Sequence, residues 1–251
     1  MTKPFVSIII PAYNSEKTLA KYLESRMSVK LSIYMRWENN CRNVFISLLE
    51  FNPKAKIIDL GCGNGEFTSK IKEKICCNKI VGIDINKESI NKAKEKEIIV
   101  KKWDLNKSLP FENNSFDVVT SNQVIEHLYY PVKFMKEIFR ILKPGGYAVI
   151  STENLASWDN IFSLFFGYTP FSMGFDDGLY KIGNPLSLHE KEIRESCSPH
   201  IRIFTWKGLT ELAKFVNFKV EKAIGSGHIF GKLGEWINKK NCRFVTIKLR
   251  K

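Results

Sequence analysis

A glycine-rich turn is the feature of this sequence most suited to holding a ligand. Gly61, Gly63 and Gly65 alternate directly after the apolar segment 57–60, and Glu66 opens a helical pattern behind them. Glycine permits positive φ angles and lets a ligand lie against bare backbone. Glu66 stands where a dinucleotide-binding turn has its third glycine, and its carboxylate would repel a pyrophosphate but tolerate a cation. The turn therefore predicts a site for a positively charged ligand.

Three acidic residues lie within or directly after predicted strands near this turn. Asp59 lies inside the apolar segment before the turn, where a carboxylate is costly without a partner. Asp84 comes about twenty residues after the turn, where an acid accepts both hydroxyls of a ribose. Asp104 follows the next strand and is placed to accept from the exocyclic amine of adenine, with Ile85 and Leu105 on the faces of the ring. A helix cap is the alternative for each acid.

Two histidines are candidates for acid–base chemistry. His127 follows the fourth predicted strand and is the best-placed general base, the alternative being a structural histidine. Glu126 beside it is a candidate for the pocket wall. His200 precedes the last predicted helix and is the second candidate, with Arg202 beside it as a candidate ligand for an anionic group. The remaining histidines, at 189 and 228, are more typical of polar contacts.

The elements that must position these residues alternate between strand and helix. Apolar runs at 57–60, 80–84, 98–103, 116–121 and 147–152 are separated by helical patterns, the clearest at 131–142, which ends at a Lys-Pro-Gly-Gly turn. Such alternation predicts a parallel sheet covered by helices on both sides. A helix at 205–215 and strands at 218–224 and 244–249 complete the chain. We therefore predict an α/β, Rossmann-like, doubly wound and mostly parallel sheet with one antiparallel strand near its edge.

In their order these motifs resemble the class I S-adenosylmethionine-dependent methyltransferases, with most similarity to the group that includes the ubiquinone-biosynthesis enzymes. The resemblance covers residues 57–153 and implies S-adenosyl-L-methionine as cofactor. It assigns the methionine portion to Asp59, Gly61 and Gly63, the ribose to Asp84, the adenine to Asp104 and Leu105, and the floor near the sulfonium to Asn122. Cys62 within the turn and Ile85 after Asp84 are further candidates for the cofactor site. A His-Ile-Arg segment before the last helix also occurs in related methyltransferases, which implies that His200 faces the acceptor.

Residues 5–14 resemble the opening of family 2 glycosyltransferases, a β-branched run stopped by a proline and a turn. The further βα units and the Asp-x-Asp metal motif of that family do not follow. We therefore expect residues 1–32 to be an appended strand–helix and residues 33–251 to form the methyltransferase domain.

An aromatic stretch follows the fifth strand, within an expected insertion at about 154–204. Seven aromatic residues fall between positions 158 and 175. A packed cap over the acceptor is favoured, and the alternative is an interfacial patch in weak contact with a membrane surface. Asp176 and Asp177 are more typical of a turn than of a metal site, so we predict no metal.

Composition limits the class of protein. The 251 residues have a hydrophobic share of 44% and a charged share of 26%, which excludes disordered and fibrous classes. No apolar run is long enough to span a bilayer, and the start lacks the pattern of a signal peptide, so a cytoplasmic protein is expected. The six cysteines contain no metal-type pair and are expected to be reduced. A net charge of +13 biases the chain toward anionic partners, although lysine-rich solvated helix faces explain it better than a nucleic-acid surface.

The predicted function is methyl transfer to a small-molecule acceptor, a hydroxyl of a sugar, a glycan precursor or a quinone-like ring. A nucleic-acid methyltransferase is the first alternative, but the Asn/Asp-Pro-Pro-aromatic loop that clamps a flipped base is missing at 121–124. A cofactor-binding module without catalysis is the second alternative.

Overall fold

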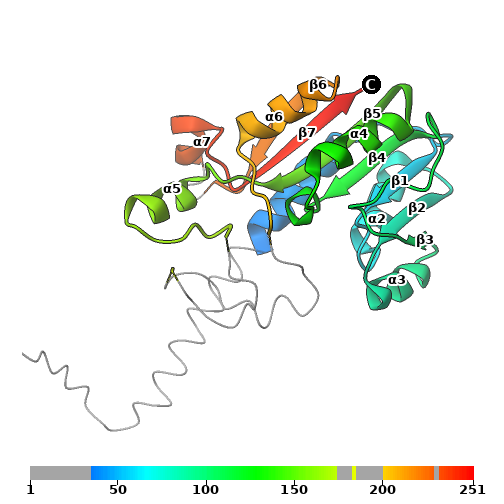
Figure 1. The fold of residues 1–251 in the computed structure, drawn as a ribbon, viewed down its shortest axis with the longest axis horizontal. Coiled ribbons are helices and arrows are strands. Elements are labelled where there is room, and N and C mark those ends of the chain that lie inside the picture. Colours follow the sequence, from blue (N-terminus) through cyan, green and yellow to red (C-terminus); the bar gives the residue numbers. More distant parts are fainter. Residues whose placement is uncertain (1–34, 174–182, 185–199, 229–231) are drawn as a thin grey trace, which may run out of the picture.

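The computed structural model describes residues 35–173, 183–184, 200–228 and 232–251, and its centre is a twisted sheet (Figure 1). Within the described residues the sheet has seven strands in the order β3-β2-β1-β4-β5-β7-β6. From one edge to the other the strands are β3 (Ile99–Lys102), β2 (Ile80–Asp84), β1 (Ile57–Leu60), β4 (Phe116–Asn122), β5 (Leu142–Glu153), β7 (Phe244–Arg250) and β6 (Lys219–Ser226).

The pairing of the strands confirms the predicted fold class. β1, β2, β3, β4 and β5 pair in parallel, with Asp59 opposite Gly82 and Thr120 in the register. β7 runs antiparallel to both of its neighbours, β5 and β6. The strand order reverses between β1 and β4, which is the place where doubly wound sheets open a crevice at their carboxyl ends.

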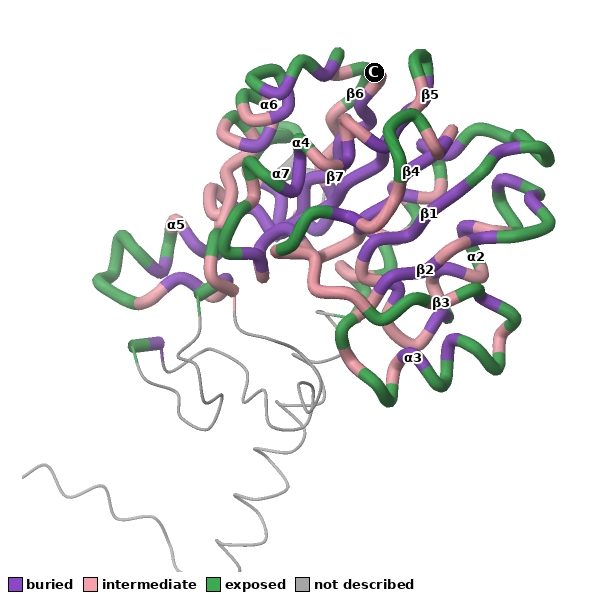
Figure 2. Tube along the Cα trace, turned by 45° about the vertical axis from the view of Figure 1, so that its right-hand side comes forward, coloured by how far each residue is buried: buried purple, intermediate pink, exposed green. Residues whose placement is uncertain are grey.

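Helices cover both faces of the sheet and bury most residues of its central strands β1, β4 and β5. One face packs on α4 (Pro131–Ile141) and α6 (Trp206–Phe215), whose buried residues include Ile138 and Leu209. The other face packs on the helix at 35–47, α2 (Glu66–Ile75) and α3 (Lys87–Lys94). Figure 2 shows the buried part of the trace along the central strands, while the outer turns are exposed.

The predicted turn after α4 is absorbed into a strand. The helix ends at Ile141 and β5 begins at Leu142, one residue earlier than the helical pattern indicated. The Lys-Pro-Gly-Gly segment lies within β5, where the register with β4 shifts between Phe116 and Val118. Gly145 has a φ of 77°, as expected for a glycine in a turn.

Three helices of the described residues were not predicted from the sequence, and the first of them is the helix at 35–47. α5 (Trp158–Phe165) follows β5, and α7 (Lys232–Asn238) lies between β6 and β7. The chain returns from the expected insertion at an isolated bridge between Asn154 and Phe204. The segment at 1–32, His189 and the pair Asp176–Asp177 lie outside the described residues. In the part of the chain that is described, no helix is both long and apolar enough to cross a bilayer.

Candidate active site

The glycine-rich turn joins β1 to α2 and leaves its backbone bare. Gly61, Gly63 and Gly65 have φ angles of 83°, 51° and 80°. A Cβ on Gly61 would lie 2.3 Å from Cγ2 of Val124, whereas a Cβ on Gly63 would meet no atom within 4 Å. Position 61 therefore requires glycine because a neighbouring loop packs on it, and position 63 presents open backbone to a ligand.

Asp84 ends β2 and braces this turn. Its Oδ2 accepts a hydrogen bond from the backbone N–H of Gly63 at 2.8 Å, and its Oδ1 accepts from the N–H of Asn86 at 2.9 Å. The cap of α3 is Asn86, whose side chain accepts from the N–H of Ser89. Because Asn86 caps the helix, the Asp84 carboxylate is left directed at the glycine turn.

The residues predicted to hold the adenine follow β2 and β3. Ile85 is exposed, and Asp104 and Leu105 are half-buried. Oδ1 of Asp104 accepts from the backbone N–H of Asn106 at 2.9 Å and from its side-chain amide at 3.1 Å. β2 and β3 are parallel neighbours, so these residues follow the carboxyl ends of two adjacent strands. Their role in holding an adenine stays a prediction.

Asp59 points into the protein instead of toward this edge. It is 3% exposed, and its two oxygens accept hydrogen bonds from the hydroxyls of Thr68 at 2.6 Å and Thr120 at 2.7 Å. Burial raises the pKa of Asp59 to about 6. The partner that this costly carboxylate needs is thus internal, and it ties β1 to α2 and β4. Burial also raises the pKa of the Cys62 thiol, so we expect that side chain to remain protonated.

Asn122 ends β4 on the other side of the glycine turn. Its Oδ1 accepts a hydrogen bond from the hydroxyl of Ser151 at 2.6 Å. Gln123, which sequence reasoning did not select, has a positive φ of 55° and donates from Nε2 to the same hydroxyl at 3.3 Å. A non-glycine residue in this conformation is uncommon, and here it turns the chain from β4 into the loop that carries the candidate base.

The two candidate catalytic histidines lie side by side. His127 ends the short 3-10 helix η1 (Ile125–His127), and its ring centroid is 4.9 Å from that of His200. The segment of His200 is fixed to η1 because the backbone N–H groups of Ile201 and Arg202 both donate to the carbonyl oxygen of Glu126. Residues 73 positions apart are therefore held against each other by backbone hydrogen bonds.

Glu126 forms a cluster with the two histidines. The side chain is fully buried, Oε2 accepts from the hydroxyl of Thr152 at 2.9 Å, and burial raises its pKa to about 8. Glu126, His127 and His200 offer ligand atoms that all lie within 4.8 Å of one another. A shared proton or a shared ligand fits this spacing. The predicted absence of a metal was argued on the pair at 176–177 and stays a prediction.

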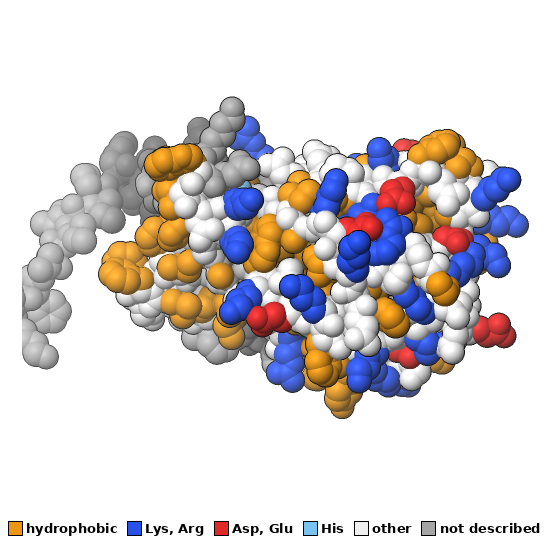
Figure 3. Space-filling view, turned by 90° about the horizontal axis from the view of Figure 1, so that it is seen from above, with side chains coloured by type: hydrophobic (Ala, Val, Ile, Leu, Met, Phe, Trp, Pro, Cys, Tyr) orange, Lys and Arg blue, Asp and Glu red, His pale blue; other side chains and the backbone are white. Residues whose placement is uncertain are grey.

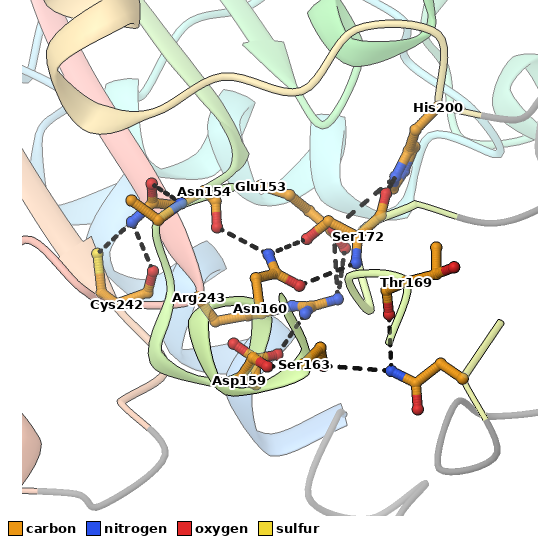
Figure 4. A network of polar contacts seen from close by, with 12 residues as sticks. Glu153, Asn154, Asp159, Asn160, Ser163, Thr169, Ser172, His200, Cys242 and Arg243 are labelled. Atoms are coloured by element: carbon orange, nitrogen blue, oxygen red, sulfur yellow. Dashed lines mark hydrogen bonds and ion pairs between the residues drawn. The ribbon is translucent and has the colours of Figure 1, made fainter. Parts of the chain in front are cut away.

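A buried ionic network supports His200 from behind (Figure 4). Nδ1 of His200 lies 2.8 Å from the carbonyl oxygen of Ser172 and 3.8 Å from a carboxylate oxygen of Glu153. Arg243 joins Glu153, at 3.2 Å, to Asp159 on α5, at 2.5 Å. Because a carbonyl oxygen only accepts, the proton of the neutral His200 ring sits on Nδ1 and Nε2 is left as an acceptor.

Sequence reasoning missed this network because its members are far apart in the chain. The only local signal was the presence of Glu153 and Arg243 at the ends of apolar strands, where a charge is costly unless it is paired.

The seven-stranded sheet with its antiparallel β7 and the glycine turn after β1 agree with the class I S-adenosylmethionine-dependent methyltransferases that the sequence motifs resemble. Residues 35–223 match a family model described as a methyltransferase domain, and the chain belongs to this family. The predicted class is thus confirmed at the level of family and fold.

Curated relatives share parts of the chain. An uncharacterised methyltransferase of Schizosaccharomyces pombe is 34% identical over 41% of this chain and 41% of its own length. A probable S-adenosylmethionine-dependent methyltransferase of Mycolicibacterium smegmatis is 29% identical over 68% and 55%. A demethylmenaquinone methyltransferase of Listeria welshimeri is 26% identical over 61% and 67%. The chain therefore spans about half the length of the first two relatives.

Among solved structures, an S-adenosylmethionine-dependent methyltransferase from Mesorhizobium loti superposes with a TM-score of 0.58 at 18% identity. The match covers 83% of this chain and 96% of the other. At this identity the similarity shows the fold alone.

Proposed function

We propose that this chain transfers a methyl group from S-adenosylmethionine to a hydroxyl group of a small acceptor. The observation that carries the proposal is the contact between His127 and His200 beside the glycine turn. His127 is on the loop after β4, and Val124 of the same loop packs on Gly61. A ligand on the turn and an acceptor at the histidines would then be neighbours. Holding two reactants together in this way supplies much of the rate of a displacement.

The residues at the turn fit the cofactor. When bound, S-adenosylmethionine supplies an activated methyl group on a sulfonium, which the acceptor oxygen takes as the carbon–sulfur bond breaks. The open backbone at Gly63 admits the ligand, and Asp84 supplies a carboxylate beside that backbone. Ile85, Asp104 and Leu105 would hold the adenine. We assign the floor of the site to Asn122.

A hydroxyl acceptor must lose its proton, and His127 is the proposed base. Nε2 of the neutral His200 ring carries no proton because Nδ1–H donates to the Ser172 carbonyl. Nε2 can therefore accept the same hydroxyl proton, which makes His200 the second candidate for the base. Arg202 is exposed on the same segment and is the proposed contact for an anionic group of the acceptor. Among the acceptors expected from the sequence, a quinone-like ring is supported by the relatives named for demethylmenaquinone.

Titration calorimetry with S-adenosylmethionine tests the cofactor site. Asp84→Ala removes the charge beside Gly63, and we expect it to weaken binding by about 10–100-fold, as for a lost hydrogen bond to a charged group. Glu73→Ala, which removes an exposed acid from α2, is the matched control and should bind like the wild type. Folded wild-type protein that takes up no S-adenosylmethionine would refute the proposed function.

A further inference from the structure

Helix α5 buries its polar side chains and exposes apolar ones. Its buried residues are Asp159, Asn160 and Ser163, whereas Leu164 and Phe165 are 57% and 80% exposed, and Phe166 just after the helix is 66% exposed. A surface helix ordinarily turns its apolar stripe to the core and its polar face to water. The aromatic stretch that we expected to pack as a cap therefore has these side chains pointing outward.

The buried polar contacts fix this orientation. Asp159 is paired with Arg243 at 2.5 Å, and Asn160 donates to the hydroxyl of Ser172 at 2.8 Å (Figure 4). Rotating the helix to bury its exposed apolar side chains would take Asp159 away from Arg243, and that guanidinium would stay buried with Glu153. The ion pair therefore favours the orientation in which the aromatic side chains are exposed.

Helix α7 adds to the same surface. Leu233, Trp236 and Ile237 are 58%, 82% and 52% exposed. The two helices are joined at their ends, because the Asn241 side chain after α7 donates to the carbonyl oxygen of Ala156 before α5. We call the exposed residues Leu164, Phe165, Phe166, Leu233, Trp236 and Ile237 the aromatic end. Figure 3 shows hydrophobic side chains gathered at the end of the molecule where α5 and α7 lie.

The charges next to the aromatic end indicate which kind of partner it binds. α7 itself carries one lysine and one glutamate, Lys232 and Glu235, whose charges offset each other. Lys239 and Lys240 are exposed directly after α7, and Asp159 of α5 is turned inward and paired with Arg243. The chain as a whole carries +13. Exposed aromatic and leucine side chains next to lysines are the composition of surfaces that enter the headgroup region of anionic membranes.

We propose that the aromatic end docks this protein on an anionic lipid bilayer, with Phe165, Phe166 and Trp236 inserted at the interface. The aromatic end is connected to the candidate active site through Ser172. Asn160 of α5 donates to the Ser172 hydroxyl, and the ring of His200 bonds to the Ser172 carbonyl oxygen. A docked protein would take up a lipid-soluble acceptor directly. This last consequence rests on the proposed function, whereas the docking itself does not.

Cosedimentation with vesicles of phosphatidylcholine, with and without phosphatidylglycerol, tests the docking surface. We expect the wild type to bind the anionic vesicles more tightly. Phe165→Ser/Phe166→Ser should weaken that binding at least about tenfold, because two large apolar side chains no longer enter the interface. Lys239→Gln/Lys240→Gln should reduce binding to the anionic vesicles and leave binding to the neutral ones unchanged.

The matched control is Phe51→Ser/Phe215→Ser. Both side chains are exposed, at 71% and 68%. They precede the amino ends of β1 and β6, whereas α5 and α7 follow the carboxyl ends of β5 and β6, which run in the same direction. Wild type that sediments with neither vesicle, or equal losses in the two double variants, would overturn the proposal. Self-association that Phe165→Ser/Phe166→Ser abolishes, without vesicle binding, would overturn it in favour of a second copy of the chain. Calorimetry with S-adenosylmethionine on the same variants separates this proposal from the proposed function. Loss of vesicle binding with unchanged affinity for S-adenosylmethionine concerns the docking surface alone.

Discussion

The side chain of His127 carries the proposed proton transfer, and its replacement separates catalysis from binding. His127→Asn should lower kcat by about 10²–10⁴-fold on a hydroxylated quinone-like acceptor, the usual contribution of a general base. Its affinity for S-adenosylmethionine should stay the same, because the residues proposed to hold that ligand follow β1, β2 and β3 or end β4, and His127 is not among them. Turnover measured against pH is the check. Full activity with an unchanged pH profile would make His127 a structural residue.

Glu126 couples the site to stability through its buried carboxyl group. The pKa rises from an ordinary value of 4.5 to about 8 on burial. Between these values the folded state binds more protons than the unfolded state, so the free energy of unfolding falls as pH rises, at up to about 1.4 kcal/mol per pH unit. The contribution is fully present below about pH 4.5 and lost above about pH 8. Asp59 acts with the same sign, but its pKa of about 6 confines its effect to lower pH.

Glu126→Gln should therefore flatten this dependence in the range from pH 6.5 to 8, where the Asp59 contribution has already been lost. Urea unfolding of both proteins across that range measures the difference. Equal slopes in the two proteins would show that the carboxyl group is ionised in the folded state.

At the scale of elements, the glycine turn allows fold and ligand to be tested separately. Gly61→Ala places a methyl group 2.3 Å from Val124, so we expect it to cost about 1–3 kcal/mol of stability. Gly63→Ala meets no atom within 4 Å and should retain most of the stability but lose affinity for S-adenosylmethionine. Gly145→Ala has the same kind of positive φ and open space, far from the turn, and is the control for backbone strain. Thermal melts and calorimetry on the three variants are decisive, and equal affinities for Gly63→Ala and Gly145→Ala would place the ligand elsewhere.

The attachment of α5 to the sheet depends on Arg243. Arg243→Ala leaves Glu153 and Asp159 buried without their partner and should cost roughly 3–5 kcal/mol. Arg250→Ala removes ion pairs with Glu50 and Glu221 that are partly exposed and should cost about 1 kcal/mol or less. The difference between the two variants in denaturant unfolding checks the prediction. Similar small losses would mean that water reaches the Arg243 network.

The elements near the glycine turn could be predicted from the sequence because their signals are local. An apolar run, a turn and an acid at the end of the next run all fall within about thirty residues of a βαβ unit. The pairing of His127 with His200 and the network of Arg243 could not be predicted, because each joins segments that only the closed sheet brings together. The helix α5 could not be oriented either. The aromatic residues of α5 indicate burial on composition alone. The ion pair that turns its polar face inward is formed with Arg243, which lies 84 positions after Asp159 in the chain.

At the scale of the whole molecule, the sheet ties the site to global stability. The glycine turn follows the central strand β1, and its backbone N–H groups at Gly61 and Cys62 both donate to the carbonyl oxygen of Ile83 at the end of β2. The turn cannot unfold without disturbing the middle of the sheet. A ligand held there binds the folded state and not the unfolded chain, so its binding free energy adds to the stability of the whole domain.

We therefore expect S-adenosylmethionine at 100 times its Kd to raise the free energy of unfolding by about 2.7 kcal/mol, which corresponds to roughly 5–10 °C in Tm for a domain of this size. Differential scanning calorimetry at several ligand concentrations should show a rise that follows the logarithm of the concentration. Asp84→Ala should require about 10–100 times more ligand for the same rise, because the variant lacks the carboxylate beside Gly63. Phe165→Ser/Phe166→Ser should behave like the wild type, since the aromatic end takes no part in holding the cofactor. A Tm that does not respond to the ligand in the wild type would mean that the turn holds nothing, whatever the fold resembles.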